Sequence, residues 1–287
     1  MVDGVLSRHR RLDWRATQFP LVHIPRKIDQ ALGPLNQAGP FSRFSRNWQV
    51  LIPKKPSDLT ENRLLACLRR DEYDRLLPNL ERVRFPKNRI IYEAAHEMRH
   101  AYFLNSGLVS LLAVADDGRT IQIGMVGSEG FVGLPIIHMA HRTPNRVMAQ
   151  APVDALRVDA ARLLAEFKRS DKLREVLLRY SQALETQFVQ SAICNPLHST
   201  RQRISRWLLM SSDALNSSSL DLTIDQIAIM LGKHRNLVSV ASRELQRKGL
   251  IEHDYGRITM LDRQGLEAVS CECYRIVKEW TAELLDS

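Results

Sequence analysis

The chain has 287 residues, of which 44% are apolar and 25% charged, a composition typical of soluble globular proteins with more than one domain. Its 41 Lys and Arg exceed its 32 Asp and Glu, and the formal net charge of +9 indicates an anionic partner. No run reaches the roughly 18–20 apolar residues that a membrane-spanning helix needs, and no secretory signal opens the chain. We therefore exclude a membrane protein and expect a cytoplasmic one.

The positive charge is concentrated near the N-terminus. Residues 1–60 contain ten Lys or Arg and four Asp or Glu, whereas residues 200–287 contain twelve of each. Residues 1–58 carry six prolines and no sustained hydrophobic period, so we interpret them as a flexible basic extension. Such an extension is either solvated without a role or contacts phosphates or a partner.

Residues 59–170 are predicted to form a sensor domain built on an antiparallel β-roll. A helical pattern covers residues 60–80. Strand-like runs follow at residues 83–85, 90–92, 101–104, 108–115 and 120–126. Turn clusters that include Gly107 and Gly118 separate these runs and supply residues that tolerate positive φ. Short strands joined by tight turns favour a small roll.

A short helix is predicted at residues 160–167 and a long one at 171–195, which Pro196 should end because proline lacks an N–H. Apolar residues cover more than one stripe of the long helix, so it needs two partners. The roll is one. The other is either the same helix of a second copy, which makes residues 171–196 a dimerisation helix, or another part of the same subunit.

Two short helices around a glycine are predicted within residues 223–251. Thr223 can cap the first helix while Gln226 reaches back to it, and Gly232 supplies the left-handed turn that ends it. The second helix has a buried stripe at Val238, Ala241 and Leu245. This arrangement predicts a helix-turn-helix, although a helix pair used only for packing has similar requirements.

The exposed side of the second helix carries the candidate DNA contacts. These are His234, Arg235, Asn236, Ser239 and Arg243. An arginine can bridge the two major-groove acceptors of guanine, an asparagine can pair with adenine, and a serine can bind a base or a phosphate.

A hairpin is predicted directly after this helix, from two apolar runs around residues 253–257. It would form the wing of a winged helix-turn-helix, with Arg257 at its tip either contacting a phosphate or simply exposed. A closing helix should begin at Asp262. Residues 197–287 are thus predicted to be the DNA-binding domain.

A roll, a long helix and a winged helix-turn-helix, in that order, resemble the Crp/Fnr superfamily of bacterial transcription regulators. The resemblance covers residues 61–287 and includes the segments IIYEAAHEMRHAYFLNSGLVSLL and GRTIQIGMVGSEGFVGL. It implies a homodimer on a palindromic operator, with RNA polymerase as a partner if the protein is an activator. It also implies that Arg235 and Asn236 read bases and that Thr223 contacts the DNA backbone. The cyclic-nucleotide-binding-like jelly roll would then take a small effector.

This sequence departs from the family pattern at the effector site. In the cyclic-nucleotide binders the glycine that Gly133 resembles precedes a glutamate that holds the ribose, whereas here Leu134 follows. The later phosphate-binding segment offers Arg142 and Arg146 only. A ribose hydroxyl without its partner loses about 1–3 kcal/mol, so we do not expect cyclic AMP to bind. Asn236 and Val240 also depart from the family pattern, which predicts a different operator sequence.

The four cysteines, Cys67, Cys194, Cys271 and Cys273, are too few and too scattered for a disulfide framework or a four-thiolate metal site. The iron–sulfur branch of the family needs clustered N-terminal cysteines, and residues 1–66 contain none. Cys271 and Cys273 lie two residues apart on the predicted closing helix and should point to different faces. We therefore expect no cofactor and no metal.

Two enzyme hypotheses compete with the regulator. Residues 96–100 read HEMRH, which matches the zinc-protease pattern of two histidines one helical turn apart with a glutamate as base. That chemistry needs a helix, but the flanking segments are strand-like, and Glu129 is an unconvincing third ligand. The second hypothesis is a jelly-roll metal enzyme that uses His138 and His141. We favour exposed histidines in both places, and no enzymatic activity.

Overall fold

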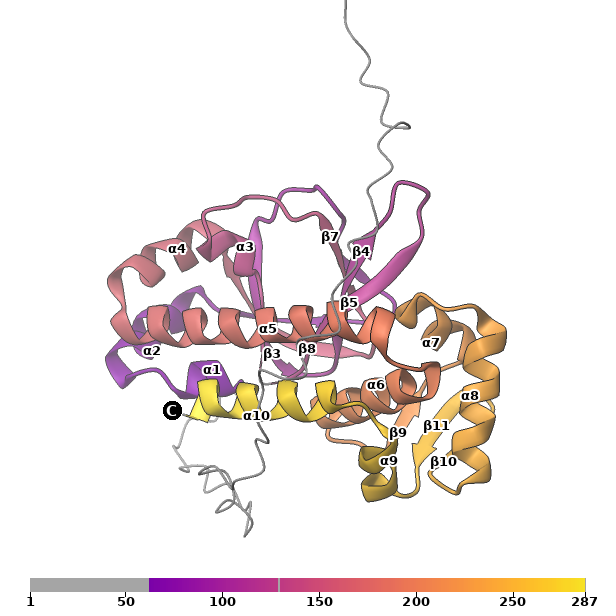
Figure 1. Ribbon diagram of the computed structural model, residues 1–287. Helices are drawn as coiled ribbons and strands as arrows, with labels where there is room; N and C mark the ends of the chain where they lie inside the picture. The colour runs from indigo at the N-terminus through magenta and orange to yellow at the C-terminus, as the bar shows by residue number, and fades with distance from the viewer. Residues whose placement is uncertain (1–61, 129, 287) are drawn as a thin grey trace, which may run out of the picture. The chain divides into compact units, whose positions relative to one another are not determined.

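The structure is a computed structural model that describes residues 62–128 and 130–286. Along the chain it contains an antiparallel β-roll, a long helix and a C-terminal winged helix-turn-helix (Figure 1). The predicted α+β class is therefore confirmed. The basic extension predicted at residues 1–58 lies outside the described residues.

The roll consists of two four-stranded antiparallel sheets, with strand orders β1-β8-β3-β6 and β2-β7-β4-β5. Their strands are β1 (Glu81–Phe85), β2 (Ile90–Tyr92), β3 (His100–Ser106), β4 (Val109–Val114), β5 (Thr120–Val126), β6 (Phe131–Val132), β7 (Asn145–Ala149) and β8 (Val153–Asp159). Gly107 and Gly118 have φ angles of +98° and +82°. The two predicted turns thus depend on backbone conformations that glycine adopts without steric cost.

The core of the roll lies between the two sheets. Phe103 and Phe131 are almost fully buried, and their ring centroids are 4.8 Å apart. Asn62 connects the start of the described chain to this core, because its side-chain amide donates hydrogen bonds of 2.8 Å to the carbonyls of Leu104 and Gly130. The same side chain caps α1 (Arg63–Ala66) by accepting from Leu64 and Leu65.

Helix α3 (Leu134–Ile137) lies between β6 and β7 of the roll. Helices α4 (Ala160–Arg169) and α5 (Asp171–Leu197) follow its last strand, β8. Asp159 caps α4 by accepting from the amides of Ala161 and Arg162. Helix α5 runs past Pro196, which lies inside its last turn, so the prediction that Pro196 ends the helix was wrong. Proline removes one hydrogen bond there, but the next residue still keeps the helical conformation. No helix in the described residues has both the length and the apolar character to cross a membrane.

The C-terminal domain begins with α6 (Thr200–Leu215), which the sequence analysis did not predict. Helices α7 (Ile224–Leu231) and α8 (Arg235–Arg247) form the predicted helix-turn-helix. The domain also contains a three-stranded sheet of order β10-β11-β9. Its strands are β9 (Ser219–Asp221), which precedes the two helices, and β10 (Ile251–Asp254) and β11 (Arg257–Met260), which follow them. Apolar side chains of the helices and the sheet share one core, which includes Ile204, Leu208, Val238 and Ile258.

Two predicted helices are divided in the structure. The pattern over residues 60–80 is split into α1, α2 (Arg70–Leu76) and η4 (Leu77–Asn79). The predicted closing helix is split into α9 (Arg263–Val269) and α10 (Glu272–Asp286), because the chain is extended at Ser270, which caps the end of α9. Helix α10 packs along α5 (Figure 1).

Candidate functional site

The first helix of the helix-turn-helix begins with the predicted capping box. Thr223 Oγ1 accepts a hydrogen bond of 3.2 Å from the Gln226 amide, and Gln226 Oε1 accepts one of 3.0 Å from the Thr223 amide. Gly232 ends the helix with φ of 58° and ψ of 39°, the left-handed conformation that the turn requires. The local structure therefore follows directly from Thr223, Gln226 and Gly232.

Helix α8 has one buried and one exposed side. Val238, Ala241 and Leu245 are buried, as predicted from their spacing. The candidate DNA contacts lie on the other side. His234, Arg235, Asn236 and Arg243 are exposed, and Ser239 is half-buried. The helix thus presents a row of polar side chains from its first turn to its middle, which is the geometry needed to enter a major groove.

Arg235 already has an acidic partner on the neighbouring helix. Its Nε lies 2.7 Å from Asp225 Oδ1, and both side chains are more than half exposed. Exposed ion pairs contribute only about 0–1 kcal/mol, so the guanidinium can leave this carboxylate for a stronger acceptor. Without such an acceptor, Asp225 holds the guanidinium of Arg235 at the start of α8, beside the other polar groups of the first turn.

The wing lies next to the capped end of α7. Its turn contains Tyr255 at φ of 42°, and a Cβ placed on Gly256 would lie 3.6 Å from Thr223 Cγ2. Arg257 Nε donates a hydrogen bond of 2.9 Å to Asp221 Oδ1, and both side chains are exposed. The structure therefore brings Thr223 and the wing to one surface.

Two exposed apolar residues on α8 were not predicted as candidate contacts. Leu237 is 53% exposed and Val240 is 48% exposed. Apolar side chains on a helix that lies in the major groove can contact the methyl group of thymine. The sequence carries a signal for both residues. They fall between the buried positions of α8, on the exposed side of the helix, where burial in the core does not explain an apolar side chain.

The four predicted effector residues are in different surroundings. Gly133 has φ of 140°, and a Cβ there would lie 2.6 Å from Ala101 Cβ, so only glycine fits. Leu134 is buried at the start of α3. Arg142 is exposed, whereas Arg146 Nε donates a hydrogen bond of 2.7 Å to Glu93 Oε1. An anion that approached Arg146 would have to compete with this carboxylate.

The HEMRH segment is not helical. Residues 96–99 form an extended connection into β3, so its two histidines lack the one-turn spacing of a zinc-protease helix. His96 Nδ1 lies 3.1 Å from the Ala94 carbonyl oxygen, and His138 Nε2 lies 3.0 Å from Ser181 Oγ. Glu129, the weak candidate for a third ligand, lies outside the described residues.

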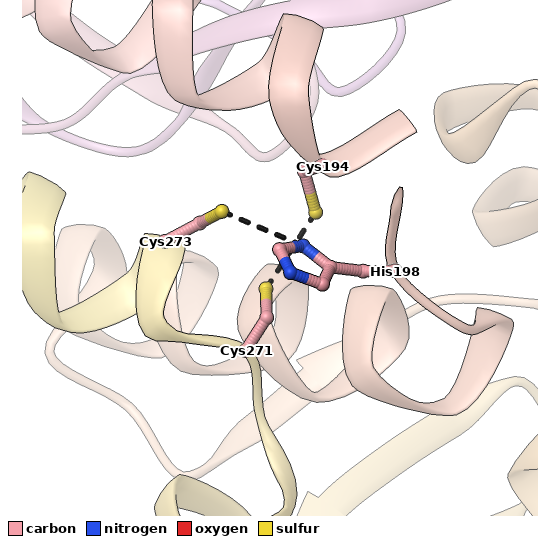
Figure 2. Close-up of side chains that lie close together, drawn as sticks. All are labelled: Cys194, His198, Cys271 and Cys273. Atoms are coloured by element: carbon pink, nitrogen blue, oxygen red, sulfur yellow. Dashed lines mark hydrogen bonds between the residues drawn. The ribbon is translucent and has the colours of Figure 1, made fainter. Parts of the chain in front are cut away.

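The prediction that the cysteines are scattered was wrong for three of the four. Cys194, Cys271 and Cys273 are buried and lie close to one another and to the partly buried His198 (Figure 2). Cys67 is exposed. The prediction that Cys271 and Cys273 point to different faces of one helix fails because Cys271 precedes the first residue of α10. Helical geometry therefore does not relate the two side chains.

Two family models match the chain. Residues 82–170 match the cyclic nucleotide-binding domain, and residues 202–269 match the Crp-like helix-turn-helix domain. The first covers most of the roll and the second covers α6 to α9 almost entirely. The order of the two matched regions is that of the observed domains.

Curated relatives include two transcriptional regulators of Thermus thermophilus. LdrP is 29% identical over 191 residues, which are 64% of this chain and 94% of LdrP. SdrP is 26% identical over 175 residues, which are 59% of this chain and 83% of SdrP.

Among solved structures, the chain is similar to TTHB099, a CRP-family transcriptional regulator from Thermus thermophilus, with a TM-score of 0.57 and 22% identity over 66% of this chain and 96% of that one. It is also similar to FixK2 from Bradyrhizobium japonicum, with a TM-score of 0.59 and 16% identity over 67% of this chain and 98% of that one. At these identities the likeness establishes a shared fold.

Proposed function

Because this chain belongs to the Crp/Fnr superfamily of transcriptional regulators and is not an enzyme, we propose that it is a homodimer that binds a palindromic DNA operator. In this proposal residues 59–170 are the sensor, residues 171–196 the dimerisation helix and residues 197–287 the DNA-binding domain. The observation that carries it is the single surface formed by the first turn of α8, the capped start of α7 and the wing.

This surface has the chemistry needed to read DNA. We assign base contacts to Arg235 and Asn236 in the first turn of α8, with His234, Ser239 and Arg243 beside them. Thr223 and Arg257 face the same surface and are assigned to the phosphate backbone, which fixes the register of the protein on the duplex. Arg235 and Arg257 each pair with an exposed carboxylate. Breaking these exposed ion pairs to bind DNA costs little free energy.

The exposed side of α5 supports dimerisation. Leu178, Val189, Ile193 and Leu197 are 49%, 51%, 38% and 72% exposed. Leu178 and Val189 are eleven residues apart, which is about three helical turns, and the other two follow at intervals of four. The four residues therefore share one stripe, opposite the side that packs on the roll. A second copy of α5 is the partner that fits an apolar helical stripe of this kind.

The effector is proposed to be a small molecule other than cyclic AMP. Leu134 is apolar and buried where a ribose-binding carboxylate is expected, and Arg146 is already paired with Glu93. A protein of the same fold, CLP from Xanthomonas campestris, is described as responsive to c-di-GMP; it is 19% identical, with a TM-score of 0.57. This supports testing cyclic dinucleotides alongside small anions and lipophilic acids.

RNA polymerase is the further partner that we propose, if the protein activates transcription. The basic residues of the N-terminal extension would add a sequence-independent attraction to the DNA phosphates.

The proposed function is tested by binding to genomic fragments. Full-length protein should protect a site with two-fold symmetry, whose half-sites lie about one helical turn apart, in a footprinting experiment at moderate salt. A scrambled duplex of the same length and composition is the control. Equal affinity for the site and the scrambled duplex, with and without cell extract, would contradict sequence-specific binding.

A further inference from the structure

Three thiols and one imidazole converge at the junction between α5 and α10. Cys194 lies in the last turn of α5, and His198 directly follows that helix. Cys271 immediately precedes α10, and Cys273 lies in its first turn. Figure 2 shows the four side chains pointing toward one another from these segments. The three cysteines are at most 2% exposed, and the His198 side chain is 11% exposed.

The distances are those of a tetrahedral ligand set. Cys194 Sγ and Cys271 Sγ are 3.6 Å apart, as are Cys273 Sγ and His198 Nδ1, and all four ligand atoms lie within 4.8 Å of one another. Zinc bonds of about 2.3 Å to sulfur and 2.0–2.1 Å to nitrogen give tetrahedron edges of about 3.5–3.8 Å. Two of the separations already match these edges, and the widest must shorten by about 1 Å for the four atoms to surround one ion.

His198 is oriented as a metal-binding histidine would be. Its Nε2 lies 3.2 Å from Glu272 Oε1, on the side of the ring away from Cys273. A proton on Nε2 can thus be donated to the Glu272 carboxylate, which leaves the lone pair of Nδ1 directed toward the thiols. Carboxylates commonly hold metal-binding histidines in this way and fix the tautomer.

Buried cations balance the charge of the cluster. Three thiolates and one divalent cation carry a net charge of −1, which a buried site must neutralise. Arg203 and Arg206 are 4% and 8% exposed, and Arg206 Nε has no hydrogen-bond partner among the described residues. The guanidinium groups of Arg203 and Arg206 donate hydrogen bonds to Asn195 and Ser191, which lie on either side of Cys194 in α5.

We propose that Cys194, His198, Cys271 and Cys273 form a closed Cys₃His site for one zinc-class divalent cation. The alternative use of two buried thiols, a disulfide, requires sulfurs about 2.05 Å apart, and it leaves the third thiol and the oriented histidine without a role. Four protein ligands leave no position open for water, so the site is structural rather than catalytic. It would fix the start of α10 to the end of α5, where α6 and the DNA-binding domain begin.

The first experiment measures metal in untagged full-length protein, purified without chelator from cells grown with added zinc. Elemental analysis should give one zinc per chain. Replacement of zinc by cobalt should produce the thiolate-to-cobalt charge-transfer band and the intense visible bands of a tetrahedral site. Neither readout depends on DNA binding, so the zinc site and the regulatory function can fail separately.

Variants distinguish a metal ligand from a residue needed only for folding. Cys273→Ser should lose most of the zinc, whereas Cys67→Ser, at the exposed cysteine, should retain it. His198→Cys keeps four ligands and should retain zinc, while His198→Ala should not. Glu272→Gln should keep the zinc but weaken its affinity about 10–100-fold in competition with a chelator, because it removes only the histidine's carboxylate partner.

Three results would overturn the proposal. The first is the same substoichiometric zinc content in the unmodified protein and in Cys273→Ser, with no tetrahedral cobalt spectrum. The second is a disulfide between Cys194 and Cys271, found by mass spectrometry after the free thiols of freshly lysed cells are alkylated. The third is iron with acid-labile sulfide in place of zinc. Equal chelator affinity for Glu272→Gln and the unmodified protein would overturn the orientation assigned to His198.

Discussion

Arg235 and Arg257 each pair with a carboxylate at the same protein surface, but they occupy different kinds of position. Arg235 starts a helix whose exposed side is open, so its guanidinium can reach the edge of a base. Arg257 lies at the start of a wing strand, and in the proposed function it contacts a phosphate. We therefore expect Arg235 to contribute to sequence specificity and Arg257 to contribute to affinity for DNA of any sequence.

Arg235→Ala should cost about 1–3 kcal/mol of operator binding and relax the preference at one base pair per half-site. Arg257→Ala should weaken binding to all sequences alike and reduce the dependence of affinity on salt by about one phosphate contact. Fluorescence anisotropy with a set of single-base operator variants, at several salt concentrations, separates the two effects. Arg70→Ala is the matched control, since Arg70 is exposed and paired with Asp74 on α2.

An unchanged base preference in Arg235→Ala would show that another residue of α8 reads that position. Asn236 lies next to Arg235 in the exposed first turn, and Leu237 and Val240 add apolar contacts along the same helix. The preference for thymine expected from these two apolar residues offers an independent check on which turn of α8 faces the bases.

At the scale of elements, α5 is the clearest case of a helix with two apolar sides. One side packs on the roll through residues such as Leu177 and Leu184, which are 0% and 6% exposed. The opposite stripe of Leu178, Val189, Ile193 and Leu197 faces outward. The pattern could be read from the sequence, because two stripes on one helix exceed what one core can bury.

Leu178→Glu and Val189→Glu should each weaken dimerisation about ten- to a hundredfold, because full burial of such a side chain contributes about 1.5–3 kcal/mol. Sedimentation equilibrium of the full chain over a range of concentrations measures this change. Ile90→Glu is the control, an exposed apolar residue of β2 that is 40% exposed. A dimer whose stability is the same in all three variants would place the interface on another surface.

Strand pairing in the roll depends in part on one acidic side chain. Asp154 of β8 is 14% exposed and accepts hydrogen bonds of 2.9 Å from Arg82 and 3.0 Å from Arg84, both on β1. Partial burial acts to raise the pKa of Asp154, but the hydrogen bonds from Arg84 and Arg82 outweigh it and lower the pKa below 3.8. The folded state is therefore stabilised by the ionised carboxylate.

A folded-state pKa below the unfolded one means that this stabilisation is present above the unfolded pKa and is lost as the pH falls through the folded pKa. The unfolding free energy of Asp154→Asn should therefore lie below that of the unmodified protein at neutral pH. The difference should shrink as the pH falls below about 4, the ordinary range of an aspartate. Urea unfolding at a series of pH values measures it. A difference that stayed constant with pH would mean that Asp154 acts through packing rather than charge.

The elements that the sequence predicted well are those with local signals. Strands β2 and β5 begin and end where they were expected, because turn residues define their ends, and the capping box defines the start of α7. Strand β8 and helix α6 were missed although they carry signals of their own. Four apolar residues of β8, Val153, Ala155, Leu156 and Val158, are buried, and Ile204, Trp207 and Leu208 of α6 have helical spacing. The break between α9 and α10 has a weaker signal in the sequence, the single residue Ser270.

The cysteine cluster could not be predicted, because it depends on long-range packing. Cys194 and Cys271 are 77 positions apart in the sequence, and they meet only because α10 turns back along α5. The candidate DNA contacts, in contrast, all lie within residues 223–257, at the start of α7, on α8 and in the wing. Local sequence patterns were therefore enough to propose the DNA contacts, which stay a prediction, whereas the cluster appeared only when the helices were placed in space.

At the scale of the whole molecule, the proposed function requires the roll to pass the state of an effector to the DNA-binding domain. The residues where cyclic-nucleotide binders hold their ligand are here an apolar side chain, Leu134, and an arginine, Arg146, that already bonds to Glu93. A ribose would meet no acceptor at Leu134, and a phosphate would have to displace Glu93. Both costs act against cyclic AMP, so a different ligand is expected to control this roll.

Cyclic AMP near millimolar concentration should leave the melting temperature of the full chain unchanged. Binding at a hundred times the dissociation constant would add about 2.7 kcal/mol, which corresponds to a shift of several degrees in a protein of this size. An operator duplex serves as the positive control, because it must stabilise the folded chain in the same assay. A shift with cyclic AMP that disappears in Arg146→Ala would contradict the prediction, since it would mean that the phosphate displaces Glu93 from Arg146. A shift with c-di-GMP or a small anion that also changes operator affinity would instead identify the class of ligand that this roll takes.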